Sequence, residues 1–130
     1  MIRRVINVEN YWKIIVYYNV NYNLFDYIAN DLYYEVSSPV EKIDDIYYNL
    51  KHKAKAVTVS SIRNHVSVVV FNKHTTREDY INSIVHEAEH VKQAILRAYN
   101  VDDKGEAPAY TIGFIVMKML EIKLMNTTFV

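Results

Sequence analysis

The stretch from Thr75 to Leu96 constrains the fold most, because it predicts one long helix that is apolar on one side. Thr75 followed by Glu78 is typical of a capping box at a helix start. The apolar positions recur at helical spacing: Ile81, Ile84, Val85, Ala88, Val91, Ile95 and Leu96. A helix of this kind buries its apolar side against another layer, so the rest of the chain must provide one.

Three short segments predict the strands of a small sheet. Tyr11–Val20 is rich in β-branched and aromatic residues, which favours a strand. Ala56–Ser61 and Val66–Phe71 have the same character and are separated by a polar turn that contains Arg63 and Asn64. The last two segments therefore predict a hairpin.

Three further helices are expected. Leu24 to Val36 carries apolar residues at helical spacing. A second helix begins near Ser38, with Ser38 as the N-cap, Pro39 in the first turn and Glu41 completing a capping box. The last helix runs from about Glu106 to about Met125.

These elements predict a single α+β domain over residues 1–130, with a small mixed or antiparallel sheet and four helices. The chain has 130 residues, which is the size of one domain, and 51% of them are hydrophobic, which excludes intrinsic disorder. It contains only two glycines, which favours long regular elements and short turns.

Composition also excludes several classes of function. The chain has no cysteine, so disulfides, iron–sulfur clusters and cysteine nucleophiles are excluded. Lys and Arg (15) balance Asp and Glu (15), which argues against nucleic acid as a partner. The longest apolar stretch, Ala107 to Met117, is interrupted by Pro108 and is shorter than the roughly 20 residues of a membrane span. No export signal is visible, so we expect a cytoplasmic protein without a membrane partner.

The chemistry-bearing motif lies inside the third predicted helix, where the sequence reads His86-Glu87-Ala88-Glu89-His90. In this H-E-x-x-H pattern the two histidines lie one turn apart on the same face, so both imidazoles can reach one metal ion. Glu87 lies about 100° around the helix from His86, close enough to reach a water on that metal. The pattern therefore predicts a site for zinc or a similar divalent ion.

A catalytic zinc site needs a third protein ligand, and the sequence leaves its identity open. The next downstream carboxylates are Asp102 and Asp103, in a polar connection, and Glu106, which opens the last helix. If that helix packs antiparallel to the third, its first turn lies nearer the end of the third helix than its middle. Glu106 then reaches the ion only if the helices cross at an angle or the loop folds back.

The pattern of H-E-x-x-H, a spacer, and a glutamate that opens another helix resembles the gluzincin metallopeptidases. The segments HEAEHVKQAIL and DDKGEAPAYTIGFI are similar, more specifically, to small metallopeptidase-like proteins of bacteriophages and bacterial mobile elements. Those proteins carry H-E-x-x-H followed by an acidic spacer and E-P-x-A-Y-x-x-G-[YF]-[IV]. The resemblance covers Ile84 to about Met117, roughly a quarter of the chain.

The resemblance implies that His86, His90 and Glu106 bind zinc and that Glu87 is the general base. Tyr110, one turn after Glu106, would then donate to the oxyanion or hydrogen-bond a ligand. The chain departs from the family at Pro108, which stands one position later than in the family pattern. Tyr110 also occupies the turn where active gluzincins often place an aspartate, so the groups around the ligands differ from those of the family.

The sequence thus predicts a zinc-dependent hydrolase, in the form of a minimal metallopeptidase that cleaves a peptide or protein. Strand Val66–Phe71 is the predicted edge for binding an extended peptide. The alternative is a non-catalytic metal-binding protein that acts in interaction or assembly for a phage or mobile element. Glu87 favours the enzyme, because a structural metal site does not need a general base. The small size of the chain favours the alternative. The sequence does not specify an oligomeric state.

Overall fold

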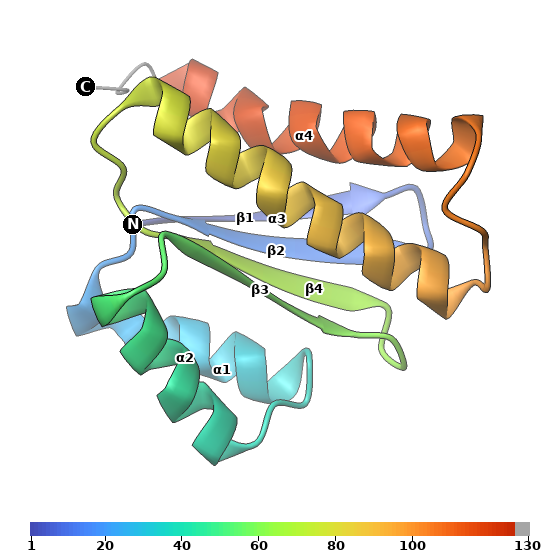
Figure 1. The fold of residues 1–130 in the computed structure, drawn as a ribbon. Coiled ribbons are helices and arrows are strands. Elements are labelled where there is room, and N and C mark those ends of the chain that lie inside the picture. Colours follow the sequence, from blue (N-terminus) through green and yellow to red (C-terminus); the bar gives the residue numbers. More distant parts are fainter. Residues whose placement is uncertain (127–130) are drawn as a thin grey trace.

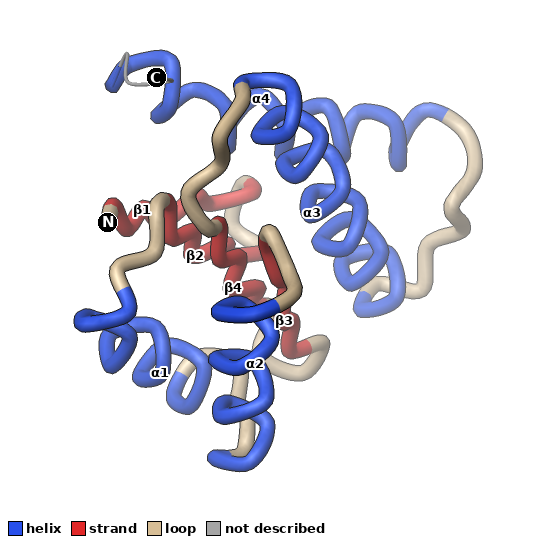
Figure 2. Tube along the Cα trace, turned by 60° about the vertical axis from the view of Figure 1, so that its left-hand side comes forward, coloured by secondary structure: helices blue, strands red, loops and turns tan. Residues whose placement is uncertain are grey.

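A computed structural model describes residues 1–126, with side chains for residues 1–121, as three layers. A four-stranded sheet lies in the middle, with helices α1 (Phe25–Tyr34) and α2 (Val40–His52) on one face. Helices α3 (Arg77–Ala98) and α4 (Glu106–Asn126) cover the other face (Figures 1 and 2). The predicted α+β class is confirmed. Within the described residues, none of the helices combines the length and apolar character required to span a bilayer.

The sheet is mixed and its strand order is β1-β2-β4-β3. The strands are β1 (Ile2–Val8), β2 (Trp12–Tyr18), β3 (Ala56–Ser61) and β4 (Val66–Phe71). β1 is antiparallel to β2, β2 is parallel to β4, and β3 is antiparallel to β4. The predicted hairpin of β3 and β4 is confirmed with the residue ranges read from the sequence.

The expectation that Val66–Phe71 offers a free edge to a peptide is wrong. This segment is β4, and β4 pairs with β2 on one side and with β3 on the other. All six of its residues are buried, as expected for a central strand. β3 lies at one end of the sheet instead, with β1 at the other, so the hairpin strand with an unpaired edge is β3.

Strand β1 was not predicted, because two adjacent arginines interrupt its apolar pattern. Arg3 and Arg4 point to opposite faces of the sheet, as successive strand residues do. Arg3 forms an ion pair with Asp31 of α1 at 2.9 Å, and Arg4 Nη1 donates to the carbonyl of Lys118 in α4 at 2.8 Å. Each arginine thus connects β1 to the helices of a different layer.

Strand alternation divides the core into two clusters. Ile14, Val16 and Tyr18 of β2 pack with α3 and α4, whereas Ile15 and Tyr17 pack with α1 and α2. These five side chains are at most 1% exposed. β2 is therefore buried on both faces, which explains why its sequence is continuously apolar rather than alternating.

Helices α1 and α2 follow the prediction except at their starts and at the end of α1, which is Tyr34 rather than Val36. A 3₁₀ turn (Tyr22–Leu24) precedes α1, so part of the predicted helix is tighter than an α-helix. The N-cap of α2 is Pro39, and no side chain caps it. The predicted capping by Ser38 is therefore wrong. Ser38 is buried, and its backbone N–H donates to the carbonyl of Leu32 at the end of α1.

The two long helices carry the predicted motif region. The N-cap of α3 is Thr76, one residue later than predicted, and its side chain accepts a hydrogen bond from Asp79 N at 3.1 Å. α4 starts beside the end of α3 and runs back along it (Figure 1), so the predicted antiparallel pair is confirmed. Ile115 and Met119 of α4 are fully buried in the cluster that also contains the apolar side of α3.

Asn72 connects three elements where β4 ends. Its Nδ2 donates to the carbonyls of Leu50, in the last turn of α2, and Ala54, just after α2, at 2.7 and 2.9 Å. Its side-chain oxygen accepts from Tyr22. Buried backbone carbonyls without a partner are costly, so this amide stabilises the end of α2 against the sheet.

We expect Asn72→Ala to lower the free energy of unfolding by about 1–3 kcal/mol, because it leaves two carbonyls and the Tyr22 hydroxyl without their partner. Urea unfolding followed by circular dichroism measures the change. Asn23→Ala is the control, because Asn23 is exposed and lies in the same 3₁₀ turn as Tyr22. Equal losses in the two variants would contradict this role for Asn72.

Candidate metal centre

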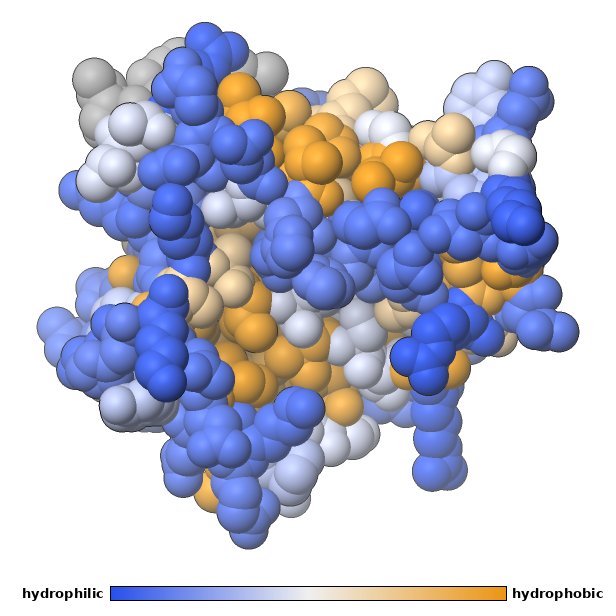
Figure 3. Space-filling model, in the orientation of Figure 1, coloured by the Kyte–Doolittle hydropathy of each residue, from blue (hydrophilic) through white to orange (hydrophobic). Residues whose placement is uncertain are grey.

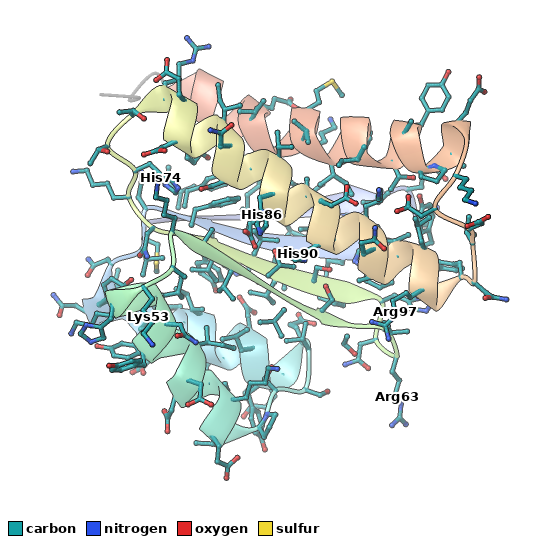
Figure 4. All side chains as sticks on the ribbon, viewed as in Figure 1. Lys53, Arg63, His74, His86, His90 and Arg97 are labelled. Atoms are coloured by element: carbon teal, nitrogen blue, oxygen red, sulfur yellow. The ribbon has the colours of Figure 1, made fainter. Side chains whose placement is uncertain are left out.

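His86 and His90 lie together on α3, as the spacing predicted. Figure 4 shows both side chains on the side of α3 that faces β3. Their Nε2 atoms are 3.2 Å apart and the two rings are nearly perpendicular, at 85°. The His86 side chain is 70% exposed. Both imidazoles are thus accessible from solvent at the same point.

The separation of the two Nε2 atoms fits two ligands of one tetrahedral ion. With Zn–N bonds of about 2.0–2.1 Å, two nitrogens at the tetrahedral angle lie roughly 3.3 Å apart. A hydrogen bond between two neutral imidazoles gives a similar distance, since one ring nitrogen donates and the other accepts. The geometry therefore suits either a shared proton or a shared metal ion.

Glu87 lies beside the histidines but is buried, with 5% of its surface exposed. Thr58 Oγ1 of β3 donates to Glu87 Oε1 at 2.9 Å. The other oxygen, Oε2, is 3.9 Å from His86 Nε2, too far for a hydrogen bond. The hydroxyl of Thr58 thus fixes one carboxylate oxygen, and the second remains directed toward the histidine pair.

A cavity of about 470 Å³ adjoins these residues, with His86 and Glu87 in its wall. Its other walls come from the start of β3, at Lys55 and Ala56, and from the first half of α3. A second hollow lies between α2 and Val57–Val59 of β3. In Figure 3 apolar side chains gather in the hollow between α3 and α2. The free edge of β3 therefore runs between two depressions, one of which contains the candidate site.

The structure does not bring Glu106 to the histidine pair. Glu106 begins α4, and α4 begins beside the end of α3 (Figure 1). His90 is eight residues before Ala98, the last residue of α3, which is about 12 Å along the helix axis. Among the described residues, no group of three or more His, Asp or Glu side chains is arranged to hold a metal ion. Glu106 as the third ligand stays a prediction.

Tyr110 is also remote from the pair in this arrangement. It lies one turn into α4 and is 75% exposed. A role for Tyr110 in the site stays a prediction as well.

The two aspartates considered as alternative ligands lie in the connection between α3 and α4. Asp102 is exposed. Asp103 accepts from Gln93 Nε2 at 2.7 Å and pairs with Lys92 Nζ at 2.9 Å. Lys92 and Gln93 hold the pKa of Asp103 below its ordinary value. The Asp103 carboxylate is therefore already engaged on α3, one turn beyond His90.

The sequence did not lead us to predict Thr58 as the partner of Glu87, although its position in β3 is informative. Residues of β3 alternate, so Val57 and Val59 pack toward α1 and α2 while Thr58 faces α3. A hydroxyl in the middle of a strand that faces a helix with a buried glutamate is a candidate partner for that glutamate. The sequence alone does not give the register between β3 and α3 that joins Thr58 to Glu87.

Comparisons with known proteins identify no relative of this chain. No family model matches the chain, and no curated protein or solved structure is significantly similar to it.

Thr58→Val should lower the free energy of unfolding by about 1–3 kcal/mol, because it removes the hydroxyl that hydrogen-bonds a buried carboxylate. Thr58→Ser keeps the hydroxyl and should retain most of the stability. Chemical denaturation of the two variants beside the unmodified chain gives both values. If Val is tolerated as well as Ser, the hydrogen bond does not position Glu87.

Proposed function

We propose that this protein is a zinc-dependent hydrolase, most simply a minimal metallopeptidase, with the cytoplasm as its expected compartment. The observation that carries the proposal is the 3.2 Å separation of His86 Nε2 and His90 Nε2 beside a buried glutamate. Two imidazoles at this spacing suit zinc, and a glutamate next to them suits a proton-transfer role.

His86 and His90 would hold the ion, with Glu106 as the proposed third ligand. Zinc bound there would supply Lewis-acid chemistry, because it lowers the pKa of a water and attracts a carbonyl oxygen. Glu87 Oε2, the oxygen that Thr58 does not occupy, accepts a proton from the attacking water. Glu87 then gives that proton to the leaving amine, which completes peptide-bond hydrolysis. Thr58 keeps the carboxylate in one orientation throughout.

The free edge of β3 supports an extended peptide as the substrate. A peptide that pairs with an edge strand gains main-chain hydrogen bonds, and its alternate side chains enter pockets on the two faces. β3 offers such an edge, with a hollow on each side of it. Because Thr58 belongs to β3, a peptide on this edge would lie next to Glu87.

A non-catalytic metal-binding protein is the second candidate function. The high exposure of His86 favours it, since catalytic sites usually exclude water. The described residues place no third ligand beside the histidine pair. This favours the non-catalytic function too, because a partner protein could supply the remaining ligands. In this case the ion would join the chain to a partner in an assembly, and Glu87 would have no role in catalysis.

We expect the purified 130-residue chain to contain about one zinc ion, as a single catalytic site of this type requires. Purification without chelators or metal-affinity tags, followed by mass spectrometry of the metal content, measures it. His86→Ala and His90→Ala should lose the zinc, because each removes one of two ligands on the same face. Glu106→Ala should lose it only if α4 supplies the third ligand.

His65→Ala is the matched control, because His65 lies in the β3–β4 turn and contacts Tyr99 at the end of α3 rather than the histidine pair. Zinc lost in the histidine variants of α3 but kept in Glu106→Ala would assign the third position to another group, with Asp103→Ala tested next. A chain that takes up no zinc even when zinc is added would overturn the proposed function.

Glu87→Gln should keep the zinc and reduce peptide hydrolysis by about 10²–10⁴-fold, because the amide cannot accept the proton. The measurement is kcat/KM on a mixture of denatured protein substrates, with metal content determined in parallel. Glu89→Gln is the control, because Glu89 pairs with Lys92 on another side of α3. Zinc binding without any hydrolysis in the unmodified chain would favour the non-catalytic protein.

A further inference from the structure

Ser83, one turn before the metal motif, lies in the wall of the same cavity and contacts a histidine. The Oγ atom of Ser83 in α3 is 2.7 Å from Nε2 of His74, which lies in the connection between β4 and α3. The other ring nitrogen of His74, Nδ1, is 2.7 Å from the backbone carbonyl oxygen of Asn72. Neither residue belongs to the H-E-x-x-H motif.

The carbonyl of Asn72 determines which nitrogen of His74 carries the proton. A carbonyl oxygen can only accept, so Nδ1 must donate to it. In the neutral ring Nε2 then has a lone pair, and the hydroxyl of Ser83 donates to that lone pair. This is the arrangement of an activated nucleophile: a hydroxyl bound to a base whose other nitrogen is held by a third group.

The position of Ser83 adds to this geometry. Ser83 is 8% exposed and forms part of the cavity wall, so it is shielded from bulk water and adjoins a space that a small molecule can occupy. Asn82 and Lys55 also line the cavity. The amide of Asn82 and the ammonium of Lys55, which pairs with Asp79 at 3.1 Å, are hydrogen-bond donors for an oxyanion that forms there.

We propose that Ser83 is a nucleophile with His74 as its general base, and that the pair accepts acyl groups from small carboxylic esters. This activity does not involve the metal motif and is independent of the proposed metallopeptidase function.

The reaction conserves atoms and protons. Ser83 Oγ forms a bond to the acyl carbon, and its proton moves to His74 Nε2. The bond from the acyl carbon to the leaving alkoxide breaks, and His74 returns the proton to that alkoxide, which leaves as an alcohol. A water then attacks the acyl carbon, gives its proton to His74, and releases a carboxylic acid as Ser83 regains its hydrogen.

The test is the reaction of the 130-residue chain with an alkyl fluorophosphonate in the presence of a chelator, followed by intact-protein and peptide mass spectrometry. We expect one adduct per chain, located at Ser83, with loss of fluoride. Ser83→Ala should give none. His74→Gln should slow labelling at least about 100-fold, because glutamine can hydrogen-bond Ser83 but cannot take its proton.

Ser60→Ala is the matched control and should label normally, because Ser60 Oγ is 2.6 Å from the hydroxyl of Ser67 rather than from a base. Circular dichroism establishes that each variant is folded. If His74→Gln unfolds, labelling of the native chain is compared with labelling in urea, and equal rates overturn the proposal. An adduct at another residue, or no adduct, also overturns it. Loss of zinc binding in His86→Ala with Ser83 labelling intact would separate this activity from the metal site.

Discussion

Burial of β2 and β4 on both faces is the constraint on which the rest of this structure depends. Ile14 and Val16 need a cover on one side of the sheet, and Ile15 and Tyr17 need one on the other. A single pair of helices cannot satisfy both, so α1 and α2 occupy one face while α3 and α4 occupy the other. The mixed strand order follows the same requirement, since the two most apolar strands lie in the centre.

This arrangement gives α3 three different sides. One side packs on the sheet, one contacts α4, and one lies beside β3, where Figure 4 shows His86 and His90. Glu87 lies at the border between the buried side and the histidine side, which is why it is buried and still meets Thr58. α4 covers a different flank from the one that carries the histidines, and its first residue, Glu106, lies beside the end of α3.

The sequence predicted the elements whose periodicity is strong, and it failed where function or charge interrupts the pattern. The hairpin and the long helices were predicted because their apolar spacing extends over many residues. β1 was missed because Arg3 and Arg4 obscure its alternation. The histidine pair was predicted because both residues lie on one helix, where spacing defines geometry. The contact of Thr58 with Glu87 was not predicted, because it depends on the packing between elements that are distant in the chain. The contact of His74 with Ser83 was not predicted either, because it depends on the path of the β4–α3 connection.

The two edge strands of the sheet, β1 and β3, differ in how readily a further strand can pair with them. Charged residues discourage a further strand at an edge, and β1 carries two adjacent arginines. β3 carries Val57, Thr58 and Val59 instead. An added strand, whether from a peptide or from another copy of the chain, would therefore dock on the side where Glu87 and the histidines lie. A second copy of the chain paired with β3 would block a peptide from the same edge. The fraction of chains with a bound peptide would therefore fall as the concentration of the protein rises.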